Sequence, residues 1–346
     1  MKRLLFLSVA ALWGCDSFSP SESTDPLSEA VILEHLEFLA GDSLYGRAAG
    51  STYGYQAAVY LRDEFSEYGL EPGVPEYFQG FSIAAATVAV AEQSRLSAIN
   101  RQLPVLNGHP PTPGAQQAEM QLTAQNVLAV LPGRGNLVGQ WLIVGAHYDH
   151  LGFVSWGADS VTIYNGADDN ASGVSLLLEV ARFLTHYYTA GVGADDARRS
   201  IMFQAYDAEE RGLLGSRHYV QNPTVPMDSI VAMVNLDMVG RMRDNRVVVA
   251  GSLTASQWTD LLESANEDNL SLWSSDAGLS RSDQWPFLQQ GKPVLYLSTG
   301  MHDDWHTPND DVWLLDVSGM VKVGDLLLAL LGTLAVQPAK PLYRWQ

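Results

Sequence analysis

The chain has 346 residues, of which 47% are hydrophobic, so it is long enough and apolar enough to bury a substantial core. Its formal net charge at pH 7 is -19. Because nucleic-acid binding requires a basic surface that follows the phosphates, this balance argues against such a function and leaves the acidic residues for solubility or for binding metal ions.

The N-terminus has the pattern of a secretory signal. Lys2 and Arg3 precede an apolar stretch, residues 4–13, that is too short to form a stable membrane-spanning helix. We therefore predict a signal peptide over residues 1–14 and export of the chain.

The signal ends in "LWGC", which resembles a bacterial lipoprotein signal, in which the cysteine is lipidated and becomes the first residue. Cys15 is the only cysteine in the chain. The Ser-, Pro- and Asp-rich residues 15–27 would form a tether. We expect a lipoprotein of the bacterial cell envelope, attached to the membrane through a lipid on Cys15 and facing the periplasm or the cell surface. A plain signal peptide, and hence a secreted protein, is the alternative.

Two helices are predicted next. Apolar residues from Ala30 to Leu39 recur at helical spacing, with Ser28 as the N-cap, and a second helix is expected over residues 54–68. Between residues 72 and 125 the periodicity weakens and Pro and Gly are scattered, as in "GHPPTPGAQQ". We interpret this region as an irregular insertion or edge hairpins, and not as a separate domain.

The remaining chain alternates between strands and helices. Runs rich in Val, Ile and Leu predict strands at 127–131, 141–146, 201–206, 230–236, 246–250 and 294–298. Helices are predicted at 172–188, 213–221 and 318–334. This alternation indicates an α/β fold of three layers (α/β/α), in which a central mixed, mostly parallel sheet has helices on both faces. We expect residues 28–346 to form a single domain.

Polar motifs follow several of these predicted strands. Ligands of open α/β sheets collect where the strands end, at their carboxyl edge. The residues expected at that edge are His147, Asp149, Asp168, Asp169, Glu209, Glu210, Asp237 and His306. Two histidines and several carboxylates form a set of nitrogen and oxygen donors that suits a pair of zinc ions.

Each of these motifs alone has an ordinary structural explanation, since an aspartate at a helix start is usually a cap and two glutamates before a helix can complement its dipole. Their joint occurrence at one edge favours a metal site. The second "GADD", at residues 193–196, fails this test, because Asp195 and Asp196 precede a predicted strand at its amino end. We expect both to be solvated loop residues.

The chain resembles the di-zinc aminopeptidases of the aminopeptidase Y and bacterial leucyl aminopeptidase type, peptidase family M28. The resemblance runs from "HLEFLAGDSLYGRAAGSTYGYQAAVYLRDEFSEYGLEP" through "NVLAVLPG", "AHYDH", "GADDNASG", "YDAEE" and "NLDMVG" to "WHTPNDD". It implies a zinc exopeptidase-like fold and hydrolysis of the N-terminal peptide bond of peptides with a free N-terminus.

The resemblance also implies a role for each site residue. His147 and Asp237 would bind one zinc ion, Glu210 and His306 would bind the other, and Asp169 would bridge the two. Glu209 would act as the general base. Asp149 would hold the free ring nitrogen of His147 and so set its tautomer.

Two residues depart from the family pattern. Trp305 replaces the tyrosine that often precedes the last histidine ligand, and its indole N–H would have to take over that hydroxyl's contact. Gln284, in "SRSDQWPF", stands where histidine is usual, in a segment expected to line the substrate pocket. From Trp285, Phe287 and Met301, which lie near the ligands in sequence, we expect a preference for neutral apolar first residues.

Three other functions compete with this one. A glutaminyl cyclase-like acyltransferase shares the fold and would hold a single zinc ion, but "GADDNASG" and "AHYDH" favour the hydrolase. A non-catalytic, receptor-like relative would have lost ligands, whereas every expected ligand is present here. A serine hydrolase is disfavoured because the sequence has no G-x-S-x-G motif.

Overall fold

The computed structural model describes residues 27–84, 121–156, 160–190 and 197–345. The predicted signal peptide, Cys15, most of the tether and the second "GADD" lie outside the described residues. So does the greater part of the predicted insertion, since only its two ends, 72–84 and 121–125, are described.

A nine-stranded mixed sheet forms the centre of the molecule, with strand order β1-β3-β7-β4-β8-β11-β9-β10 and β2 paired with β3. Its strands are β1 (Glu71–Pro72), β2 (Phe78–Ala84), β3 (Gln121–Leu131), β4 (Trp141–His147), β7 (Ser200–Tyr206), β8 (Ile230–Leu236), β9 (Arg246–Ala250), β10 (Ser271–Ser274) and β11 (Val294–Ser298). A separate antiparallel hairpin pairs β5 (Gly152–Ser155) with β6 (Val161–Tyr164).

The central strands β7, β4, β8 and β11 are parallel neighbours, whereas β3 on β7 and β9 on β11 are antiparallel. The expected mixed α/β sheet is therefore present, with its parallel part in the middle. β2 and β3 form an antiparallel pair whose register starts at Ala84 and Gln121, so the described ends of the predicted insertion belong to the sheet.

The helices are α1 (Glu29–Leu39), α2 (Thr52–Glu67), α4 (Gly173–Thr189), α5 (Leu214–Gln221), α6 (Trp258–Ala265), α7 (Gln284–Gln289) and α8 (Val317–Val336). The predicted Ser28 cap is confirmed, since its side chain accepts a hydrogen bond from the Val31 N–H. The sequence patterns did not reveal α6, α7, β10 or the β5–β6 hairpin.

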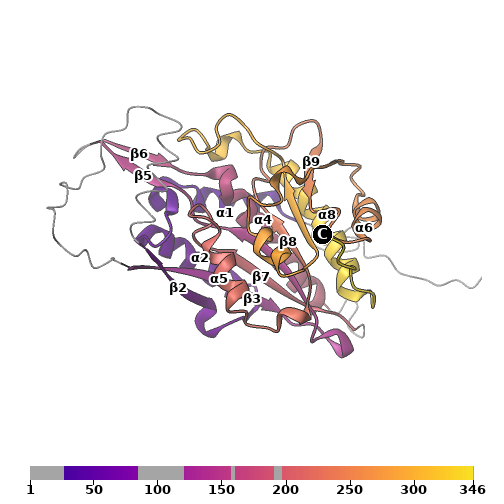
Figure 1. Ribbon diagram of the computed structural model, residues 1–346. Helices are drawn as coiled ribbons and strands as arrows, with labels where there is room; N and C mark the ends of the chain where they lie inside the picture. Colours follow the sequence, from indigo (N-terminus) through magenta and orange to yellow (C-terminus); the bar gives the residue numbers. More distant parts are fainter. Residues whose placement is uncertain (1–26, 85–120, 157–159, 191–196, 346) are drawn as a thin grey trace, which may run out of the picture.

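Helices cover both faces of the sheet (Figure 1). α4 and α8 pack on one face together with α1 and α2, while α5 and α7 pack on the other. In β4 the side chains alternate accordingly: Leu142 and Val144 belong to the larger core, and Ile143 belongs to the core under α5 and α7. Burial on both faces explains why these strands are continuous apolar runs.

α8 has the length and apolar composition of a membrane-spanning helix, and it is the only helix among the described residues that does. Its most apolar window is 72% buried within the protein, and the helix packs on α4, α6 and β4. The hydrophobic core therefore accounts for the composition of α8.

Candidate metal centre

Polar side chains from three adjacent parallel strands meet at the carboxyl edge of the sheet. His147 is the last residue of β4, Asp237 directly follows β8, and Glu209 and Glu210 follow β7 after a short turn. Because β7, β4 and β8 are neighbours that run in the same direction, their ends bring these side chains together. Asp169 reaches the same place from the short π-helical turn before α4 (Ala167–Ser172), and His306 reaches it from the loop after β11.

One group of candidate ligands contains His147, Asp169 and Asp237. The His147 Nε2 atom lies 3.2 Å from Asp169 Oδ1 and 3.6 Å from Asp237 Oδ1. One ligand atom from each residue lies within 4.8 Å of the others, and all three residues are buried.

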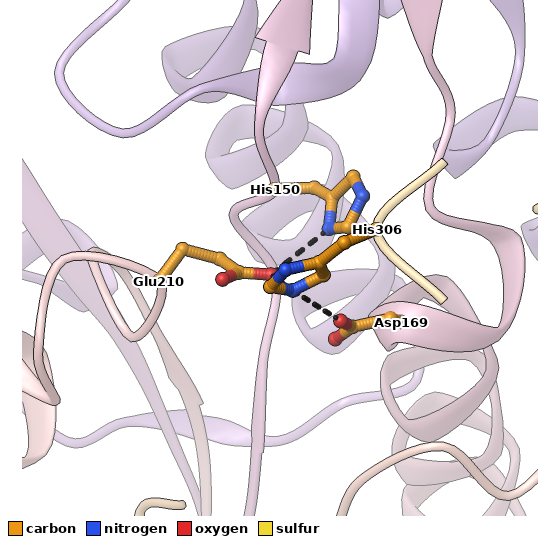
Figure 2. Close-up of side chains that lie close together, drawn as sticks. All are labelled: His150, Asp169, Glu210 and His306. Atoms are coloured by element: carbon orange, nitrogen blue, oxygen red, sulfur yellow. Dashed lines mark hydrogen bonds and ion pairs between the residues drawn. The ribbon is translucent and has the colours of Figure 1, made fainter. Parts of the chain in front are cut away.

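A second group contains His150, Asp169, Glu210 and His306, which point toward one another in Figure 2. The His306 Nε2 atom lies 2.9 Å from Glu210 Oε1 and 3.0 Å from Asp169 Oδ2. The His150 Nδ1 atom lies 3.1 Å from Glu210 Oε1. Asp169 thus belongs to both groups, with Oδ1 toward the first and Oδ2 toward the second.

The electrostatics of these groups fit bound cations. Burial by itself would raise the pKa of Asp169, but hydrogen bonds from His147 and His306 outweigh it and hold this pKa well below its usual value. Burial opposes a charge on His306, yet Glu210 and Asp169 raise its pKa to about 10. Buried carboxylates therefore require positive partners here, and a dication held by these nitrogen and oxygen donors would supply that charge in place of imidazolium protons.

Arg47, from the loop between α1 and α2, supports the backbone beneath the site. This fully buried guanidinium donates hydrogen bonds to the carbonyl oxygens of Leu39, Tyr148, Asn165 and Gly166. Burial lowers its pKa to about 10, so it stays charged at neutral pH. Arg47 thereby ties the residues after β4 to the loop that carries Asp169.

Asp310 and Gly166 shape that loop further. Both carboxylate oxygens of Asp310 accept the Asp168 N–H, at 3.1 and 3.0 Å, and Oδ2 also accepts the Asp169 N–H at 3.0 Å. Gly166 has φ of 57°, and a Cβ there would lie 2.4 Å from the His150 ring. A side chain at position 166 would therefore displace His150.

Glu209 lies beside the ligands and lines the same cavity, of about 500 Å³. Its backbone N–H donates a 2.9 Å hydrogen bond to Asp149 Oδ1. Burial, together with the neighbouring carboxylates of Glu210, Asp283 and Asp237, raises the pKa of Glu209 well above its usual value. The group is therefore positioned to hold a proton next to the metal ligands.

Asp149 contacts His147 in a different way from the one expected. The His147 Nδ1 atom lies 3.2 Å from the backbone carbonyl oxygen of Asp149, whereas the carboxylate Oδ1 is 3.8 Å away. The carboxylate instead receives the Glu209 N–H. Asp149 thus links the backbone of Glu209 to the side chain of His147.

Of the two residues that depart from the family pattern, Trp305 contacts the candidate ligands and Gln284 is buried away from them. The Trp305 indole Nε1 donates a 2.8 Å hydrogen bond to Asp169 Oδ2, and its ring stacks on His306 with centroids 3.8 Å apart. Gln284 is fully buried, accepts from Asn235 Nδ2 and donates to the carbonyls of Gly278 and Leu279. Gln284 therefore holds the preceding loop and does not line the cavity.

Sequence reasoning missed two residues of this centre. His150 ends the quoted "AHYDH" but received no role, and Asp310 is the first of the two aspartates in the quoted "WHTPNDD". Asp168 was expected at this edge, at the start of a helix, with no specific contact assigned to it. Its Oδ1 accepts the Gly240 N–H at 2.6 Å, and its Oδ2 lies 3.2 Å from His302 Nε2. His150 and Asp310 could have been identified from the sequence, because both are polar residues within the motifs that carry the other ligands.

The comparisons with known proteins agree on the family. The sequence profile of Peptidase family M28 matches residues 126–331. The chain is 29% identical over 233 residues to Aminopeptidase YwaD of Bacillus subtilis (strain 168). This alignment covers 63% of this chain and 46% of that protein. The chain spans about half the length of the curated relatives it matches.

Two solved structures share the fold. The aminopeptidase from Aneurinibacillus sp. strain AM-1 aligns with a TM-score of 0.64 at 18% identity, covering 92% of this chain and 97% of that one. The Porphyromonas gingivalis glutaminyl cyclase aligns with a TM-score of 0.60, also at 18% identity, covering 88% and 98%. Because the same fold includes both kinds of enzyme, the choice between them rests on the site.

Proposed function

The chain belongs to peptidase family M28, and from its metal centre we propose that it is an aminopeptidase with two co-catalytic zinc ions, which hydrolyses the N-terminal peptide bond of peptides with a free N-terminus. The observation that carries this proposal is the position of Asp169. Its two carboxylate oxygens face two different groups of candidate ligands.

The ligand assignment follows these groups. His147 and Asp237 would hold one zinc ion, Glu210 and His306 would hold the other, and Asp169 would bridge them. His150, which sequence reasoning left without a role, is a further candidate ligand on the Glu210 side. When bound, a pair of zinc ions supplies Lewis acidity that activates a water molecule and polarises the scissile carbonyl.

Glu209 is the proposed general base. It is adjacent to a ligand in sequence, lines the cavity, and belongs to neither ligand group. Its carboxylate would accept a proton from the attacking water and deliver it to the leaving amine. Asp149 is a positioning residue in this proposal, because its carboxylate holds the Glu209 backbone while its carbonyl receives His147 Nδ1.

The carboxylates of the centre also favour an exopeptidase. A free substrate amine would lie beside the metal ligands, flanked by Asp169, Glu209, Glu210 and Asp237, all of which line the cavity. Acetylation removes the basic amine and adds bulk, so it should abolish binding in the productive position.

The decisive experiment compares free and N-acetylated aminoacyl anilides on the zinc-loaded protein, with zinc content measured on the same preparation. We expect cleavage of the free substrates alone, with two zinc ions per chain. Equal cleavage of both substrates would instead indicate an endopeptidase or amidase. One zinc ion per chain, with cyclisation of N-terminal glutamine, would indicate the glutaminyl cyclase alternative.

We also propose that the protein is exported and held at a bacterial membrane by a lipid on Cys15. The support is the order of the N-terminal residues, in which a charged segment, an apolar stretch and the only cysteine precede a polar tether. An envelope location would place the enzyme where it meets peptides outside the cytoplasm.

A further inference from the structure

Four arginines line the cavity beside the metal centre: Arg241, Arg243, Arg246 and Arg281. The chain has only 20 lysines and arginines among 346 residues and a net charge of -19, so four in one cavity are a marked local excess of positive charge. Three of them come from "RMRDNR", directly after the motif that contains Asp237.

The arginine wall, as we call these four residues, lies on the part of the sheet beyond the metal ligands. Arg241 and Arg243 follow β8, Arg246 begins β9, and Arg281 follows β10. Since β9 and β10 lie past β11 in the strand order, the wall lies toward one edge of the sheet, and the ligands after β7, β4 and β8 lie nearer its centre. One cavity therefore has an acidic end and a basic end.

Arg241 has an unused donor. Its side chain is 8% exposed, its Nη2 atom makes a 2.5 Å ion pair with Asp304 Oδ2, and its backbone N–H donates to Thr299 Oγ1. Its Nη1 atom is buried and has no hydrogen-bond partner among the described residues. An unpaired buried donor of a charged group is costly, so this atom is suited to a ligand oxygen.

Unlike Arg241, the other three arginines have no acidic partner among the described residues. Within the described part of the chain, no ion pair involves Arg243, Arg246 or Arg281, and the Arg246 guanidinium lies over the Trp273 ring, 5.2 Å from its centroid. The acidic residues that line the cavity are Asp169, Glu209, Glu210 and Asp237, all at the metal end. Two dications would offset those four charges, which leaves the wall as the net charge of the cavity.

The wall also differs from the apolar pocket expected from the sequence. Of the three residues behind that expectation, Met301 lines the cavity, but Phe287 is fully buried and Trp285 packs with it in the core under α5 and α7. The apolar residues that do line the cavity, such as Trp273 and Val248, stand among the arginines.

We infer that this enzyme selects peptides with a carboxylate next to the scissile bond, whose N-terminal amine lies at the metal end and whose carboxylate is bound by the arginine wall. Guanidinium groups bind carboxylates with paired, charge-assisted hydrogen bonds. The carboxylate has two sources: the side chain of an N-terminal Glu or Asp, or the free C-terminus of a dipeptide. The inference rests on the proposed aminopeptidase function and names its substrate class.

The test uses substrates that differ in charge but hardly in shape. Glu-Ala-amide against Gln-Ala-amide measures the effect of a side-chain carboxylate, and Gln-Ala with a free C-terminus against Gln-Ala-amide measures that of a terminal one. We expect kcat/KM of the zinc-loaded protein to favour at least one carboxylate substrate by about 10- to 100-fold, the range for hydrogen bonds to charged groups. The ratio should decrease as salt is added, because these arginines are partly exposed and salt screens them.

Variants then assign the preference to the wall. Arg243 and Arg281 are exposed, so the double variant Arg243→Gln/Arg281→Gln should fold normally. We expect it to reduce the Glu-to-Gln or acid-to-amide ratio at least about threefold, since each exposed ion pair contributes modestly and Arg241 and Arg246 remain. Arg344→Gln is the matched control, because Arg344 is exposed and does not line the cavity; its ratio should equal that of the unmodified protein.

A second readout separates this inference from the proposed function. Trp273 and Trp305 line the cavity, so their fluorescence reports peptide binding to the metal-depleted protein without turnover. If neither carboxylate substrate is cleaved faster than its amide counterpart, or the preference is unchanged in the double variant, the inference is overturned and the aminopeptidase proposal stands. If no peptide is cleaved, that proposal fails, and the affinities measured by fluorescence still decide the inference. Glu-Ala-amide and Gln-Ala are each compared with Gln-Ala-amide, and equal affinities in both comparisons reject the inference.

Discussion

The indole N–H of Trp305 donates a 2.8 Å hydrogen bond to Asp169 Oδ2, the oxygen that also faces His306. The same indole ring stacks on His306. One side chain therefore fixes the orientation of both the proposed bridging carboxylate and one of the proposed ligands.

Replacing Trp305 with Phe should preserve the stacking but remove this hydrogen bond. We expect both zinc ions to remain bound and turnover to fall roughly tenfold, because a hydrogen bond to a charged acceptor contributes about 1.5–3 kcal/mol. Zinc stoichiometry and kcat measured together check this prediction. Unchanged turnover would mean that the indole N–H has no part in catalysis.

Asp169→Asn should lose metal and activity together, since a neutral amide is a poor bridge between two dications. Asp196→Asn is the matched control, because Asp196 is the second aspartate of the other "GADD" tetrapeptide, as Asp169 is of the first. We expect the control to retain both properties. The measurements are metal analysis and aminopeptidase rate on the same preparations, and an active Asp169→Asn enzyme with its full metal content would contradict the bridging role.

The adjacent glutamates should respond differently to the same substitution. Glu209→Gln removes the proposed proton acceptor but no ligand, so both zinc ions should stay while turnover falls about 10²- to 10⁴-fold. Glu210→Gln should weaken zinc binding first, because this carboxylate lies 2.9 Å from His306 within the second ligand group.

Metal titrations and single-turnover rates on the two variants distinguish these outcomes. If Glu209→Gln loses zinc while Glu210→Gln retains it, the two roles have been assigned to the wrong residues.

His35 should make the stability of the protein depend on pH. It is buried, its ring nitrogens contact the hydroxyls of Tyr60 and Tyr68, and burial, aided by Arg182, lowers its pKa to about 4. In the unfolded state His35 therefore takes up a proton as the pH falls below about 6.5, whereas in the folded state it does so only near pH 4. Stability is fully present above about pH 6.5 and decreases as the pH falls toward 4, by on the order of 3 kcal/mol from this residue.

Urea unfolding with a chelator at pH 7 and pH 4.5 tests this dependence without a contribution from bound metal. His35→Gln should have a smaller loss of stability on acidification than the unmodified protein. The exposed His186 provides the control, and His186→Gln should follow the unmodified protein. Identical pH dependence in all three proteins would exclude His35 as the source.

Cys15→Ser in the full-length chain should release the protein from the membrane fraction or block its processing, because the substitution removes the proposed site of lipidation. The measurement is fractionation of the bacterial envelope combined with the mass of the mature N-terminus. Membrane retention without any lipid-sized mass on the unmodified chain would remove the lipoprotein proposal and leave the enzymatic one intact.

The sequence by itself determined the elements that carry the site. The apolar runs of β4, β7, β8 and β11 predicted strands because strands buried on both faces have no polar alternation. Since ligands collect where parallel strands end, the strand ends alone indicated that His147, Asp237 and the two glutamates would meet. The sequence pattern did not indicate the short helix α7, because six residues give little periodicity.

Tertiary structure decided how the side chains at that edge face one another. Loop conformations with positive φ, as at Gly166 and His306, direct neighbouring side chains to different places, and no periodic pattern encodes them. The strand order places β9 and β10 beyond β11, which brings the arginines of "RMRDNR" into the cavity together with Arg281. Phe287 and Trp285, close to the ligands in sequence, pack into the core instead. Proximity along the chain does not specify direction, because the side a residue faces depends on the packing of elements distant in sequence.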